Sequence, residues 1–456
     1  MGGLTSIMDT SLSGMFLARL ALQTVSHNIA NANTPGFSRQ EVLVTARLPQ
    51  QLTYGSLGRG AQVDQIRRLT DSFLQQKQRT QEARLASYDQ IDSNLREIEA
   101  IFGSVSNDHL GTSLGAFFNA WSDLATPPIN SSLKQAVVSS AQSLVTDVRS
   151  TASSLDDLEQ SMNDGLSREI DNLNSLLRQV GDLNRQILYV ESSQGTANDL
   201  RDQRENLILE VSKLTRVSVL ERDDGTVDLV LKGRTVVTRA EVELLQLRRD
   251  AGTSGETASV VTASGQVPVT LDEGKLQGMI TARDDHIREA RSRLDDLAAS
   301  LIERVNALHT QGRTASSSGI LFFTGDSAST LALNATIVND FDLVATSRSG
   351  LEGDNDIAQE IATLASQPLA GEGSKSLMDR YNALIVDMAS QRSSFQFLLE
   401  NQQNVVETLA GRLDSIRGVS LDEEGANLVR YQNAYEAAAR VVTATADMFQ
   451  TLIDMV

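Results

Sequence analysis

Residues 4–29 read LTSIMDTSLSGMFLARLALQTVSHNI, and residues 428–452 read LVRYQNAYEAAARVVTATADMFQTL. In both stretches apolar residues recur in alternating steps of four and three, a heptad spacing that is typical of a helix packed lengthwise against another helix. The positions in register are Leu4, Met8, Met15, Ala18, Leu22, Val25 and Ile29 in the first stretch, and Leu428, Tyr431, Tyr435, Ala438, Val442, Phe449 and Leu452 in the second. Each stripe has one polar member, Ser11 or Thr445. We predict that these residues form a coiled-coil seam.

The first stretch is almost free of charge. Between residues 1 and 31 only Asp9 and Arg19 are charged, and Phe16, Leu17 and Leu20 add a second apolar strip outside the heptad positions. Such a helix needs cover on several sides, whereas one partner helix covers only one. Many copies packed together, or a membrane, would supply the remainder. We therefore interpret the chain first as the subunit of a polymer and the seam as its polymerisation surface.

Composition restricts the classes of protein that the chain can belong to. It has 456 residues, of which 40% are hydrophobic, enough for two or three domains. Only 4% are aromatic, so the core must consist mainly of Leu, Val, Ile and Ala, as in helix bundles. The net charge of -19 argues against nucleic acid as a partner, because binding to phosphates requires clustered Lys and Arg.

The absence of cysteine excludes disulfides, thiolate catalysis and sulfur-ligated metals. No run of eighteen apolar residues occurs, so we expect no membrane insertion. The first residues lack a basic segment followed by a continuous apolar core, so we also expect no secretory signal peptide. A protein of this kind would have to leave the cell uncleaved by another route.

Helical spacing dominates the rest of the chain. The first helix should end near Asn31, and alternation at 42–48 predicts a strand, followed by a flexible Gly-rich loop at 50–62. Further helices are predicted between 88 and 102, around Trp121, and at about 131–160, 164–193, 198–214, 274–309, 355–366 and 375–417. Trp121 lies among Phe117 and Phe118 at helical spacing, so we expect it in the core.

Residues 216–274 change to alternating apolar and polar positions, with Asp-Gly and Lys-Gly dipeptides that predict hairpin turns. The predicted fold is mainly α: an elongated rod of long antiparallel helices with a small inserted β domain. The predicted domains nest as follows: terminal helices and the N-terminal strand and loop in 1–65 with 412–456, a helical bundle in 66–215 with 275–411, and the β-rich insertion at 216–274 on the outside.

Both ends resemble a known group of proteins. SHNIANANTPGFSRQEV (26–42) is similar to the N-terminal signature of bacterial flagellar axial proteins, whose shared core is Asn-x-x-Thr-Pro-Gly and an aromatic residue; here these are Asn31, Thr34, Pro35, Gly36 and Phe37. The tail from residue 418 is similar to their C-terminal counterpart. The interior segments 196–214, 294–312 and 353–364 resemble the hook-associated protein 1 family, which forms the hook–filament junction. The chain is shorter than many members of that family.

The resemblance implies a structural flagellar protein that is located between hook and filament and exported without cleavage by the flagellar type III apparatus. The implied partners are other copies of the chain, hook protein, the second hook–filament junction protein, and a cytoplasmic export chaperone on the C-terminal helix. The implied location is extracellular, after a transient cytoplasmic stage. An alternative is another axial protein: hook or rod proteins should be β-rich between their ends, whereas the second junction protein shares a helical plan.

An enzyme is a weaker interpretation, with no catalytic, cofactor or metal residue to support it. The four histidines are far apart in sequence, and the densest titratable group, Asp284, Asp285 and His286, reads as a solvated helix face. Asp354 and Asp356 lack the glycine and glutamate spacing of a calcium loop and instead indicate a helix N-cap near Ile357.

Binding of the terminal helices to a lipid surface is another alternative. Residues 418–456 carry six acidic and two basic residues, whereas helices that bind membranes use Lys and Arg. Three of the acidic residues, Asp422, Glu423 and Glu424, suit the start of the last helix, where the helix dipole favours negative charge. We therefore favour a helical partner.

Overall fold

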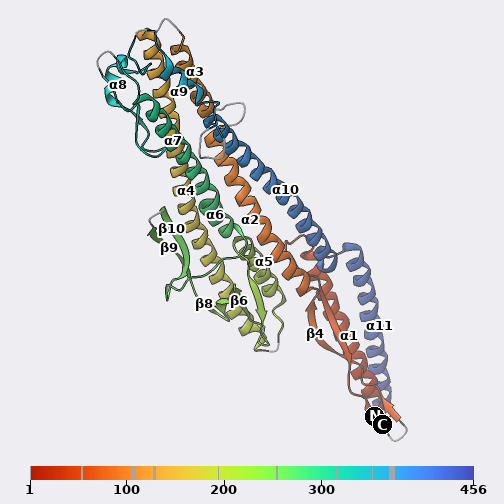
Figure 1. Cartoon of the computed structure of the whole chain (residues 1–456). Coiled ribbons are helices and arrows are strands. Elements are labelled where there is room, and N and C mark those ends of the chain that lie inside the picture. Colours follow the sequence, from red (N-terminus) through yellow and green to blue (C-terminus); the bar gives the residue numbers. More distant parts are fainter. Residues whose placement is uncertain are drawn as a thin grey trace. The chain divides into compact units, whose positions relative to one another are not determined.

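The computed structural model describes residues 2–52, 55–103, 109–126, 130–193, 195–252, 255–314, 317–351, 353–368 and 375–455. Long helices dominate the chain, and the strands form sheets of only two to four members (Figure 1). The longest helices are α1 (Gly2–Ala30), α2 (Ser72–Phe102), α4 (Ser131–Glu191), α10 (Leu377–Arg417) and α11 (Leu421–Asp454). The predicted class, mainly α with small β parts, is confirmed.

The chain folds as two compact units. The terminal unit contains residues Met1–Arg84, Ile170–Gly274 and Gln402–Val456, and the bundle unit contains Leu85–Glu169 and Lys275–Asn401. The β-rich segment thus belongs to the same unit as the terminal helices. The three-domain division given above stays a prediction.

In the terminal unit, α1 is followed by an antiparallel hairpin of β1 (Gln40–Ala46) and β4 (Ala61–Arg68), with β2 (Gln50–Leu52) and β3 (Gly55–Leu57) paired between them. The segment 50–62, predicted as a flexible loop, therefore contains β2, β3 and the start of β4, and β4 was not predicted. In β4, Ala61, Val63, Ile66 and Arg68 are the half-buried positions, and polar residues separate them, so the strand has only a weak hydrophobic pattern.

The β-rich segment lies in the same unit and confirms the predicted hairpins. A sheet in the order β5-β6-β7-β8 turns at Gly225 and at Lys232 and Gly233, all with positive φ. Its strands, and the hairpin that follows, are β5 (Ser218–Glu221), β6 (Val227–Leu231), β7 (Arg234–Thr238), β8 (Glu241–Val242), β9 (Leu245–Gly252) and β10 (Gly255–Thr262). Helix α5 (Asn198–Leu214) directly precedes this sheet.

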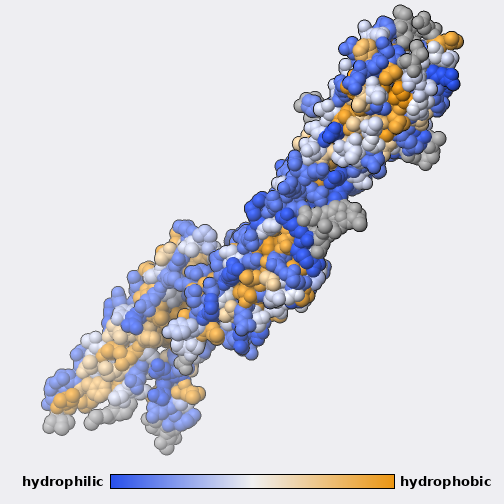
Figure 2. All heavy atoms as spheres, turned by 90° about the vertical axis from the view of Figure 1, so that its left-hand side faces the viewer, coloured by the Kyte–Doolittle hydropathy of each residue, from blue (hydrophilic) through white to orange (hydrophobic). Residues whose placement is uncertain are grey.

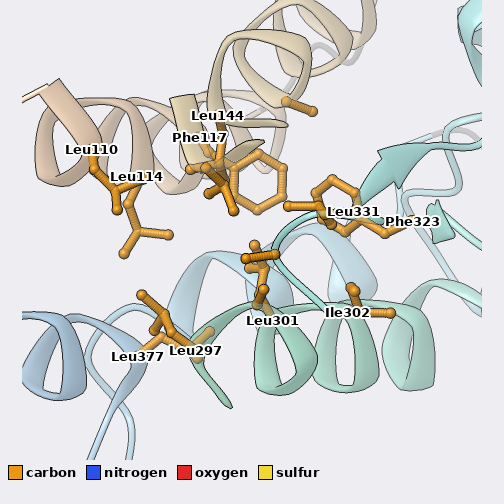
Figure 3. Close-up of a cluster of buried hydrophobic side chains, with 14 of the residues drawn as sticks. Leu110, Leu114, Phe117, Leu144, Leu297, Leu301, Ile302, Phe323, Leu331 and Leu377 are labelled. Atoms are coloured by element: carbon orange, nitrogen blue, oxygen red, sulfur yellow. The ribbon is translucent and has the colours of Figure 1, made fainter. Parts of the chain in front are cut away.

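The bundle unit holds the large apolar core (Figure 3). It contains parts of α2, α4 and α10. Its other helices and strands are α3 (His109–Leu124), α6 (Lys275–Thr281), a π-helix at Ala282–Ile287, α7 (Arg288–His309), β11 (Phe323–Thr324), β12 (Ala332–Leu333), α8 (Ala335–Asn339), a 3₁₀ turn at Phe341–Leu343 and α9 (Asp356–Thr363). Trp121 is fully buried, as predicted, and its ring contacts Phe117 and Phe322.

Two local predictions need correction. Helices predicted at 131–160 and 164–193 form the single helix α4. Asp284, Asp285 and His286 are predicted to lie on a solvated helix face, but only Asp285 is exposed. Asp284 pairs with the buried Arg283, and the His286 ring packs 5.7 Å from that of Phe395. The predicted helix start near Ile357 is confirmed, because α9 begins at Asp356.

Candidate functional site

Helices α1 and α11 pack side by side as an antiparallel pair (Figure 1). A Cβ placed on Gly14 would lie 3.9 Å from Cβ of Ala438, and Asn28 Nδ2 donates to Glu424 Oε2 over 3.3 Å. Gly14 and Asn28 are fourteen residues apart, as are Ala438 and Glu424, but the order along the chain is reversed. The two helices therefore keep one register over two heptads.

The structure places every predicted seam residue on this pair, with differing degrees of burial. Ala18, Val25 and Thr445 are buried, and the exposed members are Ile29, Tyr435 and Leu452. The others are half-buried: Leu4, Met8, Ser11, Met15, Leu22, Leu428, Tyr431, Ala438, Val442 and Phe449. Their role in polymerisation stays a prediction.

The face of α1 that is most buried lies slightly to one side of the predicted stripe. It contains Gly14, Ala18, Ala21, Val25 and Asn28, which also follow steps of four and three. Sequence reasoning missed Gly14, Ala21 and Asn28 because it followed the stripe with the larger residues Met15, Leu22 and Ile29 at the neighbouring positions. The spacing did contain a signal, since steps of three and then four from Leu4 lead through Gly14, Ala18, Ala21 and Val25 to Asn28.

Much apolar surface stays uncovered on the pair. Phe16 is 51% exposed on α1, and Val441, Met448 and Met455 are 43%, 55% and 79% exposed on α11. Figure 2 shows orange atoms among blue over the lowest part of the molecule, where Figure 1 places the terminal helices. Val441 and Met448 on α11 and Met455 directly after its end are seven residues apart, so they continue a second heptad stripe beside the first. Uncovered apolar stripes of this kind are typical of interaction surfaces.

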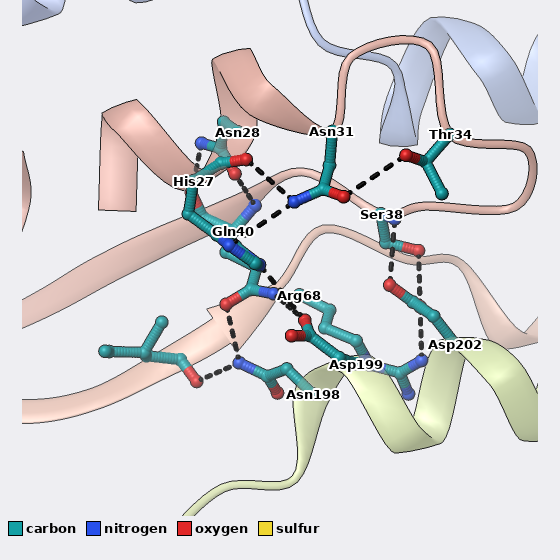
Figure 4. A network of polar contacts seen from close by, with 11 residues as sticks. His27, Asn28, Asn31, Thr34, Ser38, Gln40, Arg68, Asn198, Asp199 and Asp202 are labelled. Atoms are coloured by element: carbon teal, nitrogen blue, oxygen red, sulfur yellow. Dashed lines mark hydrogen bonds and ion pairs between the residues drawn. The ribbon is translucent and has the colours of Figure 1, made fainter. Parts of the chain in front are cut away.

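The family-signature turn follows α1 and is held by hydrogen bonds (Figure 4). Asn31 Nδ2 donates to the His27 carbonyl over 3.0 Å, and Thr34 Oγ1 donates to Asn31 Oδ1 over 3.2 Å. The Phe37 ring packs edge-on to the His27 ring at 5.4 Å. These contacts fold the chain back after α1 and direct it into β1.

Glycine is required at position 36. Its φ is 76°, and a Cβ there would lie only 2.0 Å from Asn206 Oδ1 of α5. The turn therefore approaches α5 too closely for any side chain. Next to it, Asn206 Nδ2 donates to the Pro35 carbonyl over 3.4 Å.

Asp202 on α5 is the centre of a buried polar network (Figure 4). Its carboxylate accepts hydrogen bonds from Ser38 N and Ser38 Oγ over 2.9 and 2.8 Å, and from Arg68 Nη1 over 2.7 Å. One turn earlier, Asp199 accepts from Gln40 Nε2 over 2.8 Å. Helix α5 thereby fixes the start of β1 and the end of β4, the two strand ends nearest the signature turn.

A second polar cluster joins the signature segment to the start of α11. Arg39 Nε lies 2.7 Å from Glu424 Oε1, and Arg39 Nη1 lies 2.7 Å from Glu423 Oε2. Burial by itself would lower the pKa of Arg39, but the hydrogen bond to Glu423 and the charge of Glu424 outweigh it and raise the pKa. Glu424 is only 1% exposed, whereas the Glu423 side chain is 63% exposed.

The described residues contain neither a cluster of metal ligands nor a membrane-spanning helix. Among them, no three His, Asp or Glu side chains lie close enough together to hold a metal ion. Within the same ranges, no helix is both long and apolar enough to cross a membrane.

The two ends match families of flagellar rod proteins. Residues 8–37 match the family described as Flagella basal body rod protein, and residues 409–455 match Flagellar basal body rod FlgEFG protein C-terminal. These matches cover α1 from Met8 onward with the signature turn, and the whole of α11. The chain is therefore a structural protein of the bacterial flagellum, an extracellular structure, and not an enzyme.

The interior identifies the family. Residues 95–323, half of the chain, match the family described as Flagellar hook-associated protein FlgK helical domain. The chain belongs to this family, whose members are components of the hook–filament junction.

Whole-chain comparisons agree. Flagellar hook-associated protein 1 of Salmonella typhimurium is 24% identical over 99% of this chain and 100% of the relative, and that of Bacillus subtilis is 26% identical over 98% and 97%. The alignment to the Salmonella relative spans 554 positions against 456 residues here, so that relative has segments that this chain lacks. The structure of the flagellar hook junction protein FlgK from Burkholderia pseudomallei shares the fold, with a TM-score of 0.65 and 14% identity over 76% of this chain and all of that one.

Proposed function

We propose that the chain polymerises through α1 and α11 to form the zone between hook and filament, with hook protein on one side and the second junction protein on the other. The observation that supports this most is the incomplete cover of the α1/α11 pair. Seven of the predicted seam residues on α11 are half-buried or exposed even though α1 is in place: Leu428, Tyr431, Tyr435, Ala438, Val442, Phe449 and Leu452.

A regular polymer would complete this cover. Heterologous packing of one copy on the next generates rings or helical tubes, and every copy in a tube has neighbours on both sides. The uncovered stripe of Val441, Met448 and Met455 has the heptad spacing that a neighbouring helix requires. In a tube, the terminal helices of the neighbouring copies would provide this helix for every subunit.

We further propose that the chain is exported uncleaved by the flagellar type III apparatus, and that an export chaperone covers α11 in the cytoplasm. An exposed apolar helix face promotes aggregation unless a partner covers it. A helix-in-groove contact with a chaperone would protect the same stripe that later faces other subunits. Chaperone and polymer would then compete for Val441 and Met448.

The substitution Val442→Asp tests the polymerisation surface. Val442 is half-buried on the seam face of α11, so the added carboxylate would become buried and unpaired in an assembly at a cost on the order of 3 kcal/mol per subunit. We expect the purified variant to remain folded by circular dichroism. In a strain that lacks the protein, it should restore neither filaments in electron micrographs nor swimming.

The matched control is Gln432→Glu, which adds the same charge at an exposed position of α11 outside the predicted seam. It should restore filaments and swimming fully. Normal filaments with Val442→Asp would refute polymerisation through this face. Failure of both variants would instead indicate that any added negative charge on α11 blocks export.

A further inference from the structure

The apolar contacts between α1 and α11 favour the observed alignment of the two helices only slightly over alignments shifted along the helix axis. The middle of the α1 side contains Gly14, Ala18 and Ala21, which are small and nearly interchangeable. A heptad repeat gives a similar apolar alignment whenever one helix moves by seven residues, about 10 Å along the axis. Apolar contact alone therefore selects the in-register pairing only weakly.

One polar contact in the seam differs from this pattern. Asn28 and Glu424 occupy heptad positions of the two facing stripes, and each is only 1% exposed. Asn28 Nδ2 donates to Glu424 Oε2 over 3.3 Å, and Arg39 Nε pairs with the other carboxylate oxygen over 2.7 Å. Asn28 is itself fixed, because its amide also exchanges hydrogen bonds of 2.9 and 3.0 Å with the backbone of Gln40.

A buried carboxylate without its partners is costly, so this contact penalises every other alignment. A displacement by seven residues would remove Glu424 from Asn28 and Arg39 together. A polar residue at one heptad position is known to specify register in coiled coils at some cost in stability. The same principle applies here to an antiparallel pair within one chain.

We propose that Glu424, held by Asn28 and Arg39, is the residue that sets the register of α11 against α1. Only residues 418–420 separate α10 from α11, so the pair can slip only if the first turn of α11 unwinds. That turn contains Glu424, and its backbone N–H bonds to Ser420 O over 2.9 Å. Anchoring Glu424 therefore both prevents the unwinding and selects the alignment.

The consequence for assembly rests on the proposed function: register decides which residues of the two helices lie side by side on the surface that the next subunit meets. The register itself does not depend on polymerisation. It can be measured on the purified monomer, so a failure of the polymerisation test and a failure of the present proposal are distinguishable.

Disulfide trapping measures the register directly, because the chain contains no cysteine of its own. The pair Gly14→Cys with Ala438→Cys reports the observed register, since the Cβ atoms at these positions are 3.9 Å apart, within the range of a disulfide. The pair Gly14→Cys with Thr445→Cys reports a displacement by one heptad. A third pair, Gly14→Cys with Gln432→Cys, gives the background rate for the exposed side of α11.

Each pair is combined with Glu424→Leu, which keeps the size and helix propensity but removes the carboxylate. The matched control is Glu423→Leu, which removes the exposed partner of Arg39 from the same turn. With the native or control sequence, we expect the 14/438 disulfide to form at least about tenfold faster than the 14/445 disulfide. With Glu424→Leu, that ratio should fall to within about threefold, while 14/438 and 14/445 both stay above background.

Two results would overturn the proposal. An unchanged ratio with Glu424→Leu would mean that side-chain size sets the register, for instance Tyr431 and Tyr435 against the small residues of α1. A fall of both 14/438 and 14/445 to the background rate would mean that Glu424 holds α11 on α1 without selecting an alignment.

Discussion

His309 is the buried residue whose protonation state the structure defines best. It is 1% exposed in the bundle unit, beside Trp121 and Phe322. Its Nδ1 donates to the Ile320 carbonyl over 2.7 Å, and its Nε2 accepts from Ala345 N over 3.0 Å, which requires the neutral ring. Burial lowers the pKa of His309 to about 4 from the ordinary value of 6.5.

This pKa predicts a loss of stability in mild acid. Between pH 6.5 and 4 the unfolded chain binds a proton at His309 that the folded chain does not, so the stability contributed by the neutral ring is complete above pH 6.5 and decreases as the pH falls to 4. The expected loss is about 3 kcal/mol, measured by urea unfolding of the bundle unit's transition at several pH values. In His309→Gln, which cannot titrate, the loss over this range should be smaller by about that amount. Equal slopes for the two proteins would contradict the assignment.

Asp202 is the residue on which the signature segment depends most. Asp202→Ala leaves Ser38 N–H and Arg68 without their shared acceptor in a buried place, at an expected cost of about 3–5 kcal/mol. The segment from Ser38 to Ala46 should then exchange its amide hydrogens much faster, as measured by mass spectrometry. Asp223→Ala, on an exposed turn, is the control and should leave exchange at 38–46 unchanged. The prediction is wrong if both variants match the parent.

Sequence alone located the signature turn but could not identify its partners. The resemblance singled out Gly36 and Phe37, whereas the contact of Gly36 with Asn206 and that of Ser38 with Asp202 join residues more than 160 positions apart. A single sequence does not indicate which distant residues pair. Asp202 is one of many acidic residues on helices, so nothing marks it as the partner of Ser38. The polar partners of the site therefore appeared only with the fold.

Among the elements, α4 departs most from expectation. Residues 161–165, SMNDG, contain turn-forming types, which is consistent with the break predicted near residue 162. In the structure Met162 and Asn163 are buried within a continuous helix, and a Cβ on Gly165 would lie 2.7 Å from Met279 Cε. The glycine allows a close approach of α6 and does not end the helix.

The substitution Ser161→Pro distinguishes the two interpretations. In a linker, proline at this exposed position would be tolerated. In the middle of α4 it removes a backbone hydrogen bond and clashes with the preceding turn, so it should destabilise the chain by about 3 kcal/mol or more. Urea unfolding measures the difference, with Ser161→Ala as a control that should be neutral or slightly stabilising. A neutral Ser161→Pro would favour two helices.

Strand prediction depended on pattern strength. The hairpins of the β-rich segment were found because Asp-Gly and Lys-Gly turns lie between strongly apolar runs, and Gly225 and Gly233 do have positive φ. Strand β4 was missed because its buried side includes Arg68 and Ala61 as well as Val63 and Ile66. Its pairing with β1 is stabilised by α5, which is distant in sequence, and by α1, whose apolar residues have helical spacing. Neither contact is visible in the alternation of β4 itself.

At the scale of the whole molecule, the two units differ in how completely they bury their apolar residues. The bundle unit encloses a continuous core with fully buried Phe117, Trp121 and Leu144. The α1/α11 pair of the terminal unit covers one face of each helix and leaves others to solvent. Heptad spacing predicted this from the sequence, because two apolar stripes on two helices exceed what one mutual contact can bury. Heptad spacing indicates that neighbouring helices are needed, but it does not specify how many copies supply them.

Hydrogen–deuterium exchange of the purified monomer and of isolated hook–filament junctions tests the central claim most directly. A helix with little tertiary cover opens locally at low free energy, so amides of 4–29 and 428–452 should exchange in the monomer at least a hundredfold faster than those of 137–155 in α4. In the junctions, the same two segments should become as protected as α4. Slow exchange of both segments in the monomer, or no gain of protection on assembly, would contradict the account.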